Sequence, residues 1–455
     1  MKPRILLLNA TIVTGSSSFK GHLGIEGDRI AGIWRGKEKP AFPGAAMINL
    51  RGKILMAGGI DAHVHFREPG MTAKADIASE SAAALLGGIT SFMDMPNTKP
   101  PTVNLATLED KLRRAESTSA INYGFHLGAT NDNAGQIGRY LALGLGGRFA
   151  GIKVFMGSST GNMLVDGRDA LETLFKLKGK TILVHCEEEK TIRDNLQRAR
   201  ELYGDGIPFS MHPLIRSRKA CIESTRKALD MAIEFGTHLH ILHVSTEEEV
   251  RMIRKAKKSN PNITAETSVN YLWFCDKDYE RLGGRLKCNP AVKGEADRKA
   301  LRKALADGVI DTIGSDHAPH LLQEKSAPYL QCPSGLPTIQ YSLPVAISLA
   351  LREGIIPLSR IASAFSEMPA RIFGIKDRGF LEKGCFADLV VIDPKKTWTA
   401  GPPASKCGWS PYEGETLGCS VEKVWVNGFL AVDDGRMCIG KGLYRPRQLQ
   451  FLSIG

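Results

Sequence analysis

Short apolar segments alternate with longer amphipathic segments through the middle of the chain, and this alternation restricts the fold more than any other feature. Each apolar segment resembles a buried strand, and the stretch that follows it has helical spacing. About eight such units over roughly 300 residues predict an α/β fold, a (β/α)8 TIM barrel. The alternative is an open doubly wound sheet, but no G-x-G-x-x-G sequence follows an early strand. The apolar segments are ILMAGGIDAHVHF, GITSFMDMPNT, INYGFHLGAT, GIKVFMGSS, TILVHCE, HLHILHVST, ITAETSV and DTIGSDHAPH.

The two ends of the chain have a different pattern. Residues 1–50 are short alternating runs with Gly and Asp at the bends, and residues 421–435 form a strand-turn-strand pattern around an Asn-Gly pair. Because chain termini often lie close together, both ends are expected to pair in one small β-rich domain. The predicted domains are therefore 1–52 with 386–455 for the small domain, and 53–385 for the barrel.

Composition excludes several classes of protein. Hydrophobic residues make up 43% and charged residues 24% of the 455 residues, which is typical of a globular protein. No stretch approaches the roughly 18 apolar residues of a membrane helix, and the N-terminal sequence is a poor signal peptide. The nine cysteines are scattered without a C-x-x-C pair, which favours a reducing compartment. We therefore expect a cytoplasmic protein without membrane contact.

The formal charge of +12 raises the question of an anionic partner. Lysine and arginine are spread along the chain, and no nucleic-acid-binding motif is present. We therefore expect no nucleic-acid binding. A general positive field would still attract an acidic small molecule.

Residues that bind metals well follow several of the predicted strands. His63 and His65 are two positions apart, so both imidazoles face the same side of a strand, and His185, His243 and Asp316 each end another strand. An isolated H-x-H pair is often structural, but strand ends meet at the C-terminal face of a barrel, where active sites lie. Imidazole and carboxylate ligands without cysteine fit zinc better than manganese, cobalt or iron.

Lys153 lies in the middle of the apolar run GIKVF, where an ammonium group is costly. Burial beside divalent cations would favour the neutral amine, which can react with carbon dioxide to give a carbamate. A carbamate has two oxygens and could bridge two metal ions. The alternative is a lysine that snorkels to solvent or forms a salt bridge.

Taken together, the motifs of the chain resemble the cyclic amidohydrolases of the amidohydrolase superfamily, and among these the dihydroorotase family. The resemblance extends nearly end to end and implies a TIM barrel with a small β domain built from both termini. It implies one zinc ion on His63, His65 and Asp316, a second on His185 and His243, and carbamylated Lys153 as the bridge. The motifs are GGIDAHVHFREPG, GGITSFMDMPNTKPPT, IKVFMGSSTGNMLVDG, HPLIRSRKA, LHILHVSTEEE, GSDHAPH, FADLVVIDP and SPYEGETLGCSVEKVWVNG.

The resemblance also implies a reaction, the reversible cyclisation of N-carbamoyl-L-aspartate to L-dihydroorotate and water in pyrimidine biosynthesis. A hydroxide that bridges the two metal ions would attack the ring carbonyl, with Asp316 as the catalytic base and then acid. Arg67, Asn97 and His320 would bind the substrate carboxylate, and Asn289 would contact the ring. Arginine suits a planar carboxylate particularly well.

Alternatives within and outside this reaction class remain. Many dihydroorotases carry a His-His pair where this chain has Asn270 and Tyr271. An allantoinase or a dihydropyrimidinase/hydantoinase would use the same chemistry on another ring. A catalytically inactive scaffold subunit for aspartate transcarbamoylase is a further alternative, although every expected ligand position is filled. The family implies a homodimer and a possible association with aspartate transcarbamoylase.

Overall fold

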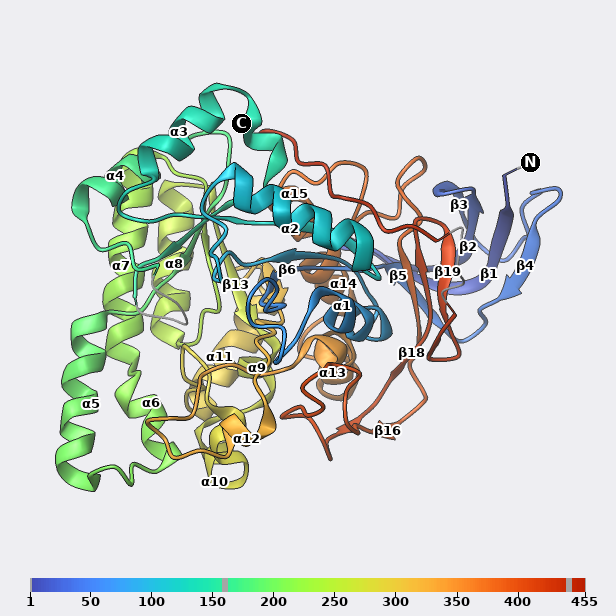
Figure 1. Cartoon of the computed structure of the whole chain (residues 1–455). Helices are drawn as coiled ribbons and strands as arrows, with labels where there is room; N and C mark the ends of the chain where they lie inside the picture. Colours follow the sequence, from blue (N-terminus) through green and yellow to red (C-terminus); the bar gives the residue numbers. More distant parts are fainter. Residues whose placement is uncertain (1, 158–162, 439–443, 455) are drawn as a thin grey trace.

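The computed structural model describes residues 2–157, 163–438 and 444–454 of the chain, and within these ranges eight parallel strand positions close into a barrel (Figure 1). In one arc of the barrel β6 pairs with β7 and β7 with β8, and the other arc runs from β9 to β14. The barrel closes where Val64 bridges His317 and His65 N–H donates to the His317 carbonyl at 2.7 Å. The strands are β6 (Gly59–Val64), β7 (Ile89–Asp94), β8 (Asn122–Phe125) continued by β9 (Leu127–Gly128), β10 (Ile152–Phe155), β11 (Ile182–His185), β12 (Leu239–Ile241), β13 (Ile263–Ser268) and β14 (Thr312–Gly314).

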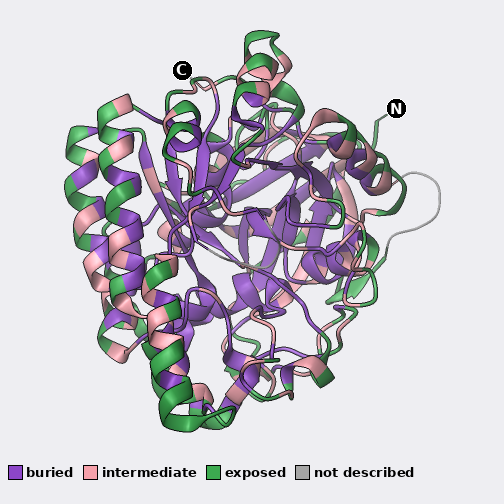
Figure 2. Ribbon diagram, turned by 60° about the vertical axis from the view of Figure 1, so that its left-hand side comes forward, coloured by how far each residue is buried: buried purple, intermediate pink, exposed green. Residues whose placement is uncertain are grey.

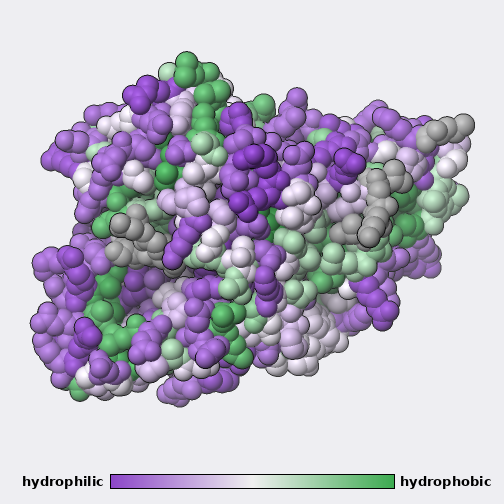
Figure 3. Space-filling view, in the orientation of Figure 1, coloured by the Kyte–Doolittle hydropathy of each residue, from purple (hydrophilic) through white to green (hydrophobic). Residues whose placement is uncertain are grey.

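Helices follow the strands and cover the outside of the barrel. Their inner faces are buried against the strands (Figure 2), and the surface over them is largely hydrophilic (Figure 3), as expected for amphipathic helices. This arrangement confirms the predicted TIM barrel. The helices are α1 (Ile77–Leu86), α2 (Leu105–Thr118), α3 (Ala134–Ala142), α4 (Arg168–Phe175), α5 (Glu189–Tyr203), α6 (His212–Ile215), α7 (Arg218–Phe235), α8 (Glu247–Ser259), α9 (Val269–Trp273), α10 (Tyr279–Leu282), α11 (Glu295–Ala306), α12 (Leu322–Lys325), α13 (Ile339–Glu353), α14 (Leu358–Ala362) and α15 (Met368–Ile372).

Both ends of the chain join one further sheet, as predicted. The order of its main path is β20-β19-β18-β15-β5-β1-β2-β3, and the antiparallel pairing of β5 with β15 joins the N-terminal and C-terminal parts. Asn427 and Gly428 have φ of 51° and 80°, the left-handed conformation of a tight hairpin turn. The strands are β1 (Arg4–Val13), β2 (Ser18–Glu26), β3 (Arg29–Arg35), β4 (Ala46–Asn49), β5 (Ile54–Ala57), β15 (Leu389–Asp393), β18 (Ser420–Val426), β19 (Phe429–Asp433) and β20 (Arg436–Met437), with β16 (Trp398–Thr399) and β17 (Thr416–Leu417) in a separate pair.

The limits of the two domains, 1–52 with 386–455 and 53–385, stay a prediction. Because β5 pairs within the terminal sheet, we propose that the first boundary lies after Ala57. The last residues leave that sheet: Leu449 and Phe451 pack in an apolar cluster with residues of the barrel strands. Among the described residues, no helix is long and apolar enough to cross a membrane.

Candidate metal centre and active site

Three of the predicted ligands meet at the C-terminal end of the barrel. His63 belongs to β6, His65 follows that strand, and Asp316 follows β14. Asp316 Oδ1 lies 3.3 Å from His63 Nε2 and 3.4 Å from His65 Nε2. One ligand atom from each residue lies within 4.8 Å of the others, a spacing that can hold a metal ion. The arrangement follows from the closure of the barrel, which brings β6 and β14 side by side.

The other two predicted histidines form a pair next to these three residues. His185 Nδ1 lies 2.8 Å from His243 Nε2, and the His243 ring centroid is 5.4 Å from that of His63. Lys153 belongs to the neighbouring strand β10, where it pairs in register with Leu183 of β11. Its charge helps to lower the pKa of both His185 and His243, after the larger effect of their burial. All six predicted ligands therefore belong to one neighbourhood.

In three of the histidines, the ring nitrogen that points away from the centre lies next to a side-chain oxygen, and in His63 and His65 the two are hydrogen-bonded. His63 Nδ1 lies 2.6 Å from Glu266 Oε1, and His65 Nδ1 lies 2.8 Å from Asn97 Oδ1. A protonated outward nitrogen leaves the inward nitrogen with its lone pair free for a metal ion. His185 Nε2 lies 3.2 Å from Glu187 Oε2, a distance that allows an ion pair but without the geometry of a hydrogen bond, and its Nδ1 faces His243. The donor set therefore fits a binuclear metal centre.

Glu266 and Glu187 were not among the residues identified from the sequence. Glu266 lies within the buried strand β13 and is completely buried itself, so a charged residue inside a predicted strand was the available signal. Glu187 lies two residues beyond His185, and Arg216 donates from Nε to both of its carboxylate oxygens at 3.2 and 2.9 Å. This pairing keeps the Glu187 carboxylate ionised, since Arg216 lowers its pKa against the effect of burial.

Replacing Glu266 by Gln is expected to weaken metal binding about tenfold to a hundredfold, because His63 loses a charged acceptor on its outward nitrogen. Competition with a chromophoric chelator measures the change. Glu249→Gln is the matched control, since Glu249 is also buried but contacts Thr225 and Thr246 instead of a histidine. Equal metal affinity in Glu266→Gln and the wild type would contradict the assigned role.

Lys153 is as buried as the sequence predicts, with 1% of its surface exposed. Its Nζ lies 4.6 Å from the ring centroid of Phe155 and makes no hydrogen bond within the described ranges. Burial lowers the pKa of Lys153 to about 7, although Asp316 and Glu266 oppose the shift. A large part of this amine is therefore neutral at neutral pH, which is the form that reacts with carbon dioxide.

Three site residues have a backbone conformation that residues other than glycine rarely adopt. Arg67, His243 and Asp316 have φ of 66°, 41° and 47°. Such left-handed conformations are unfavourable for residues with a Cβ and are concentrated at functional sites. Here each one directs a side chain toward the centre from just beyond a strand end.

Three of the four predicted substrate residues, Arg67, Asn97 and Asn289, line a small cavity of about 20 Å³ beside the ligands, and His320 lies behind Arg67 without lining it. Arg67 is 2% exposed; its Nε donates to the Pro319 carbonyl and its Nη2 lies 3.0 Å from His320 Nε2. Within the described ranges Arg67 forms no ion pair with a carboxylate, and burial lowers its pKa to about 10. Asn289 Oδ1 is buried without a hydrogen-bond partner there. The lining residues are His65, Arg67, Asn97, Asn289, Asp316, Ala318, Ser334 and Gly335.

Asn270 and Tyr271, which replace the expected histidine pair, have structural contacts. Tyr271 Oη donates to the Pro290 carbonyl at 2.7 Å, directly after Asn289. Asn270 Oδ1 accepts from Tyr412 Oη at 2.9 Å. Both residues are buried and neither lines the cavity, so the departure from the family pattern leaves the candidate ligands in place.

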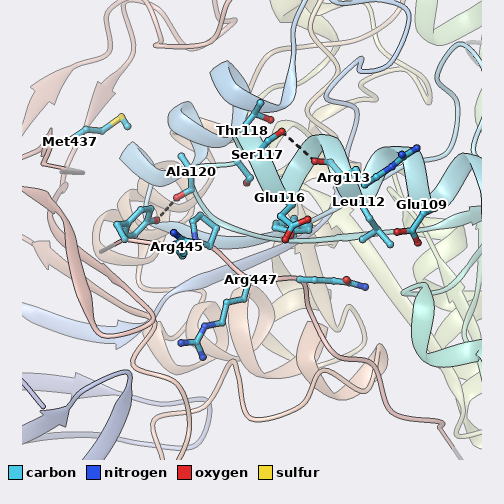
Figure 4. Close-up of a pocket in the computed structure, with 15 residues that line it drawn as sticks. Glu109, Leu112, Arg113, Glu116, Ser117, Thr118, Ala120, Met437, Arg445 and Arg447 are labelled. Atoms are coloured by element: carbon cyan, nitrogen blue, oxygen red, sulfur yellow. Dashed lines mark hydrogen bonds between the residues drawn. The ribbon is translucent and has the colours of Figure 1, made fainter. Parts of the chain in front are cut away.

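A much larger cavity, of about 740 Å³, lies between the C-terminal end of α2 and residues 444–448 (Figure 4). Its lining includes residues 118–120, which precede β8, so it opens at the N-terminal face of the barrel. That face usually contributes to stability rather than catalysis. None of the candidate ligands lines it.

Comparisons with known proteins agree with this geometry. The model of the amidohydrolase family matches residues 54–430. A dihydroorotase from Methanosarcina acetivorans is 35% identical over 424 residues, which cover 90% of this chain and 88% of that protein. A dihydroorotase from Methanothermobacter thermautotrophicus is 32% identical, with 94% of each chain covered. The solved structure of L-hydantoinase (dihydropyrimidinase) from Arthrobacter aurescens has a TM-score of 0.91 at 24% identity, covering 99% of this chain and 100% of that one, and shows the shared fold.

Proposed function

The chain belongs to the amidohydrolase family, and we propose that within it the protein is a dihydroorotase that interconverts N-carbamoyl-L-aspartate and L-dihydroorotate. Its similarity to proteins named dihydroorotase over about nine tenths of the chain supports this substrate. The reaction closes or hydrolyses an amide bond in a six-membered ring that carries a carboxylate. A site for it needs groups that activate water and a separate group that binds the carboxylate.

The observation that carries the proposal is the buried guanidinium of Arg67. A buried cation without a carboxylate partner is costly, and an anionic ligand would offset that cost. Arg67 lines the same cavity as His65 and Asp316, so an anion bound to it would lie beside the metal ligands. Dihydroorotate carries such a carboxylate, whereas dihydropyrimidines, hydantoins and allantoin do not.

We further propose that the metal is zinc, with His63, His65 and Asp316 on one ion and His185 and His243 on the other. Carbamylated Lys153 would bridge them: its Nζ bonds to the carbon of carbon dioxide, a proton leaves, and an anion replaces a potential cation. When bound, the two ions would polarise the ring carbonyl and lower the pKa of a water molecule.

The protein's own groups would position the substrate and move the proton. Arg67, Asn97 and His320 hold the carboxylate, and Asn289 contacts the ring, which fixes the amide carbonyl for attack. Asp316 accepts the proton of the attacking water on its carboxylate and gives it to the leaving ring nitrogen. In the biosynthetic direction the same transfers run in reverse. A homodimer and an association with aspartate transcarbamoylase stay predictions.

A substrate panel tests the proposal. The purified protein is assayed with dihydroorotate, dihydrouracil, hydantoin and allantoin, with and without a chelator. We expect hydrolysis of dihydroorotate to exceed that of the uncharged rings by about 10³-fold in kcat/KM, and the chelator to abolish it. Preference for an uncharged ring would favour a hydantoinase or allantoinase. A protein that hydrolyses no ring and binds no zinc would favour a scaffold subunit.

A further inference from the structure

Lys74 lies in the segment between β6 and α1 and reaches toward the proposed carboxylate site. Its Nζ lies 3.0 Å from His320 Nδ1 and 2.7 Å from Glu324 Oε1. The Lys74 side chain is 23% exposed, whereas the His320 side chain is 3% exposed. A partly exposed cation therefore contacts one nitrogen of a buried imidazole.

The surroundings of His320 determine which of its nitrogens carries the proton. An ammonium group has no lone pair and can only donate, so His320 Nδ1 must accept from Lys74. His320 Nε2 lies 3.1 Å from the Ser334 carbonyl, which can only accept, so Nε2 must carry a hydrogen. Burial and the charges of Arg67, Lys325 and Lys74 lower the pKa of His320, which keeps the imidazole neutral.

Two donors therefore converge beside the cavity. His320 Nε2–H lies 3.0 Å from Arg67 Nη2, which is also a donor, and neither can accept from the other. Both Arg67 and Ser334 line the cavity. A carboxylate in that cavity could accept from Arg67 and share the single Nε2 hydrogen of His320 with the Ser334 carbonyl, and this contact would offset the repulsion between the two donors.

We propose that Lys74 is a positioning residue for the substrate carboxylate: it holds His320 as the neutral Nε2–H tautomer, so that His320 and Arg67 donate to the same anion. This inference rests on the proposed function, because it assumes a substrate with a carboxylate. Lys74 itself does not line the cavity and acts through His320.

Neighbouring groups hold this arrangement in place. Glu324 pairs with Lys74, and its Oε2 accepts from the Leu321 amide at 2.9 Å. The indole nitrogen of Trp409 donates to the His320 carbonyl at 2.7 Å. A Cβ at position 335 would lie 3.0 Å from His320 Cδ2, so Gly335 allows its loop to pack closely against the imidazole.

The test combines kinetics with nitrogen NMR on zinc-loaded enzyme. We expect Lys74→Met to raise KM for dihydroorotate about tenfold with kcat within about twofold, since one oriented, charge-assisted donor is lost. Lys74→Arg keeps a cationic donor next to His320, and its KM for dihydroorotate is expected to lie within about threefold of the wild-type value. Hydrolysis of dihydrouracil, which lacks the carboxylate, is expected to be unchanged. Lys190→Met, which removes an exposed lysine paired with Asp194, is the control.

The NMR arm uses protein labelled with ¹⁵N-histidine, assigned with a His320→Gln variant and without substrate. The wild type is expected to show a protonated Nε2 and an unprotonated Nδ1 at His320, and Lys74→Met a mixture of tautomers. A protonated Nδ1 in the wild type, or an unchanged KM in Lys74→Met, would overturn the inference. If the wild type fails to hydrolyse dihydroorotate, the proposed function fails, and the spectrum still decides the Lys74–His320 contact.

Discussion

Replacing Asp316 by Asn is expected to lower kcat for dihydroorotate hydrolysis about 10³-fold while much of the zinc stays bound. The amide keeps one oxygen near His63 and His65 but cannot accept the proton of the attacking water. Asp316 Oδ1 faces both imidazoles at 3.3 and 3.4 Å. The backbone at this residue is left-handed, and asparagine can adopt that conformation as aspartate does. Asparagine also tolerates that backbone better than most residues.

Steady-state kinetics and zinc content measured on the same Asp316→Asn sample check this prediction. Asp307→Asn is the matched control, because Asp307 is at the surface in an ion pair with Arg254 and is expected to leave both quantities unchanged. Activity of Asp316→Asn within about tenfold of the wild type would contradict the assigned proton transfer. Activity that returns in full with excess zinc would assign Asp316 to metal binding alone.

Arg67→Met is expected to reduce kcat/KM for dihydroorotate about 10³-fold, because the substrate carboxylate would lose its buried cationic partner. The kcat/KM for uncharged dihydrouracil is expected to stay the same or rise, because the variant removes a buried cation and this ring has no carboxylate to pair with it. The ratio of the two kcat/KM values is therefore the measurement that matters, because a general loss of folding or metal would lower both.

Arg67→Lys is the matched control for this prediction. Lysine keeps the charge but loses the planar pair of donors and the contact from Nε to the Pro319 carbonyl, so an intermediate loss is expected. Equal losses on both substrates in Arg67→Met would remove the basis for a carboxylate-bearing substrate. The account would then favour a site that accepts an uncharged cyclic amide.

The barrel and the cluster of ligands could be predicted because both depend on local patterns. His63 and His65 face one side of a strand by their spacing, and the closure of the barrel places Asp316 beside them. A related signal was present for Glu266, which like Lys153 is a charged residue inside a predicted strand, but its strand is less apolar and only the lysine was identified. Glu266 differs from Lys153 because its role as the acceptor for His63 Nδ1 can be recognised only when the two side chains are known to be in contact.

The rest of the site depends on contacts that the sequence does not encode locally. Lys74 and His320 are separated by 246 positions, and nothing in either segment indicates that they touch. The predicted boundary at residues 52 and 53 stays a prediction, because residues 54–57 continue directly into the first barrel strand without a loop signal, and only the pairing of β5 in the folded chain suggests the alternative after Ala57. Local patterns thus placed the ligands on strand ends, whereas the pairing of outward nitrogens with acceptors required the folded chain.

Anomalous diffraction from crystals of the zinc-loaded protein tests the central claim most directly. The account predicts one zinc peak among His63, His65 and Asp316, a second at His185 and His243, and a carbamate on Lys153 between them. Zinc bound elsewhere, or these side chains without a zinc peak, would contradict it.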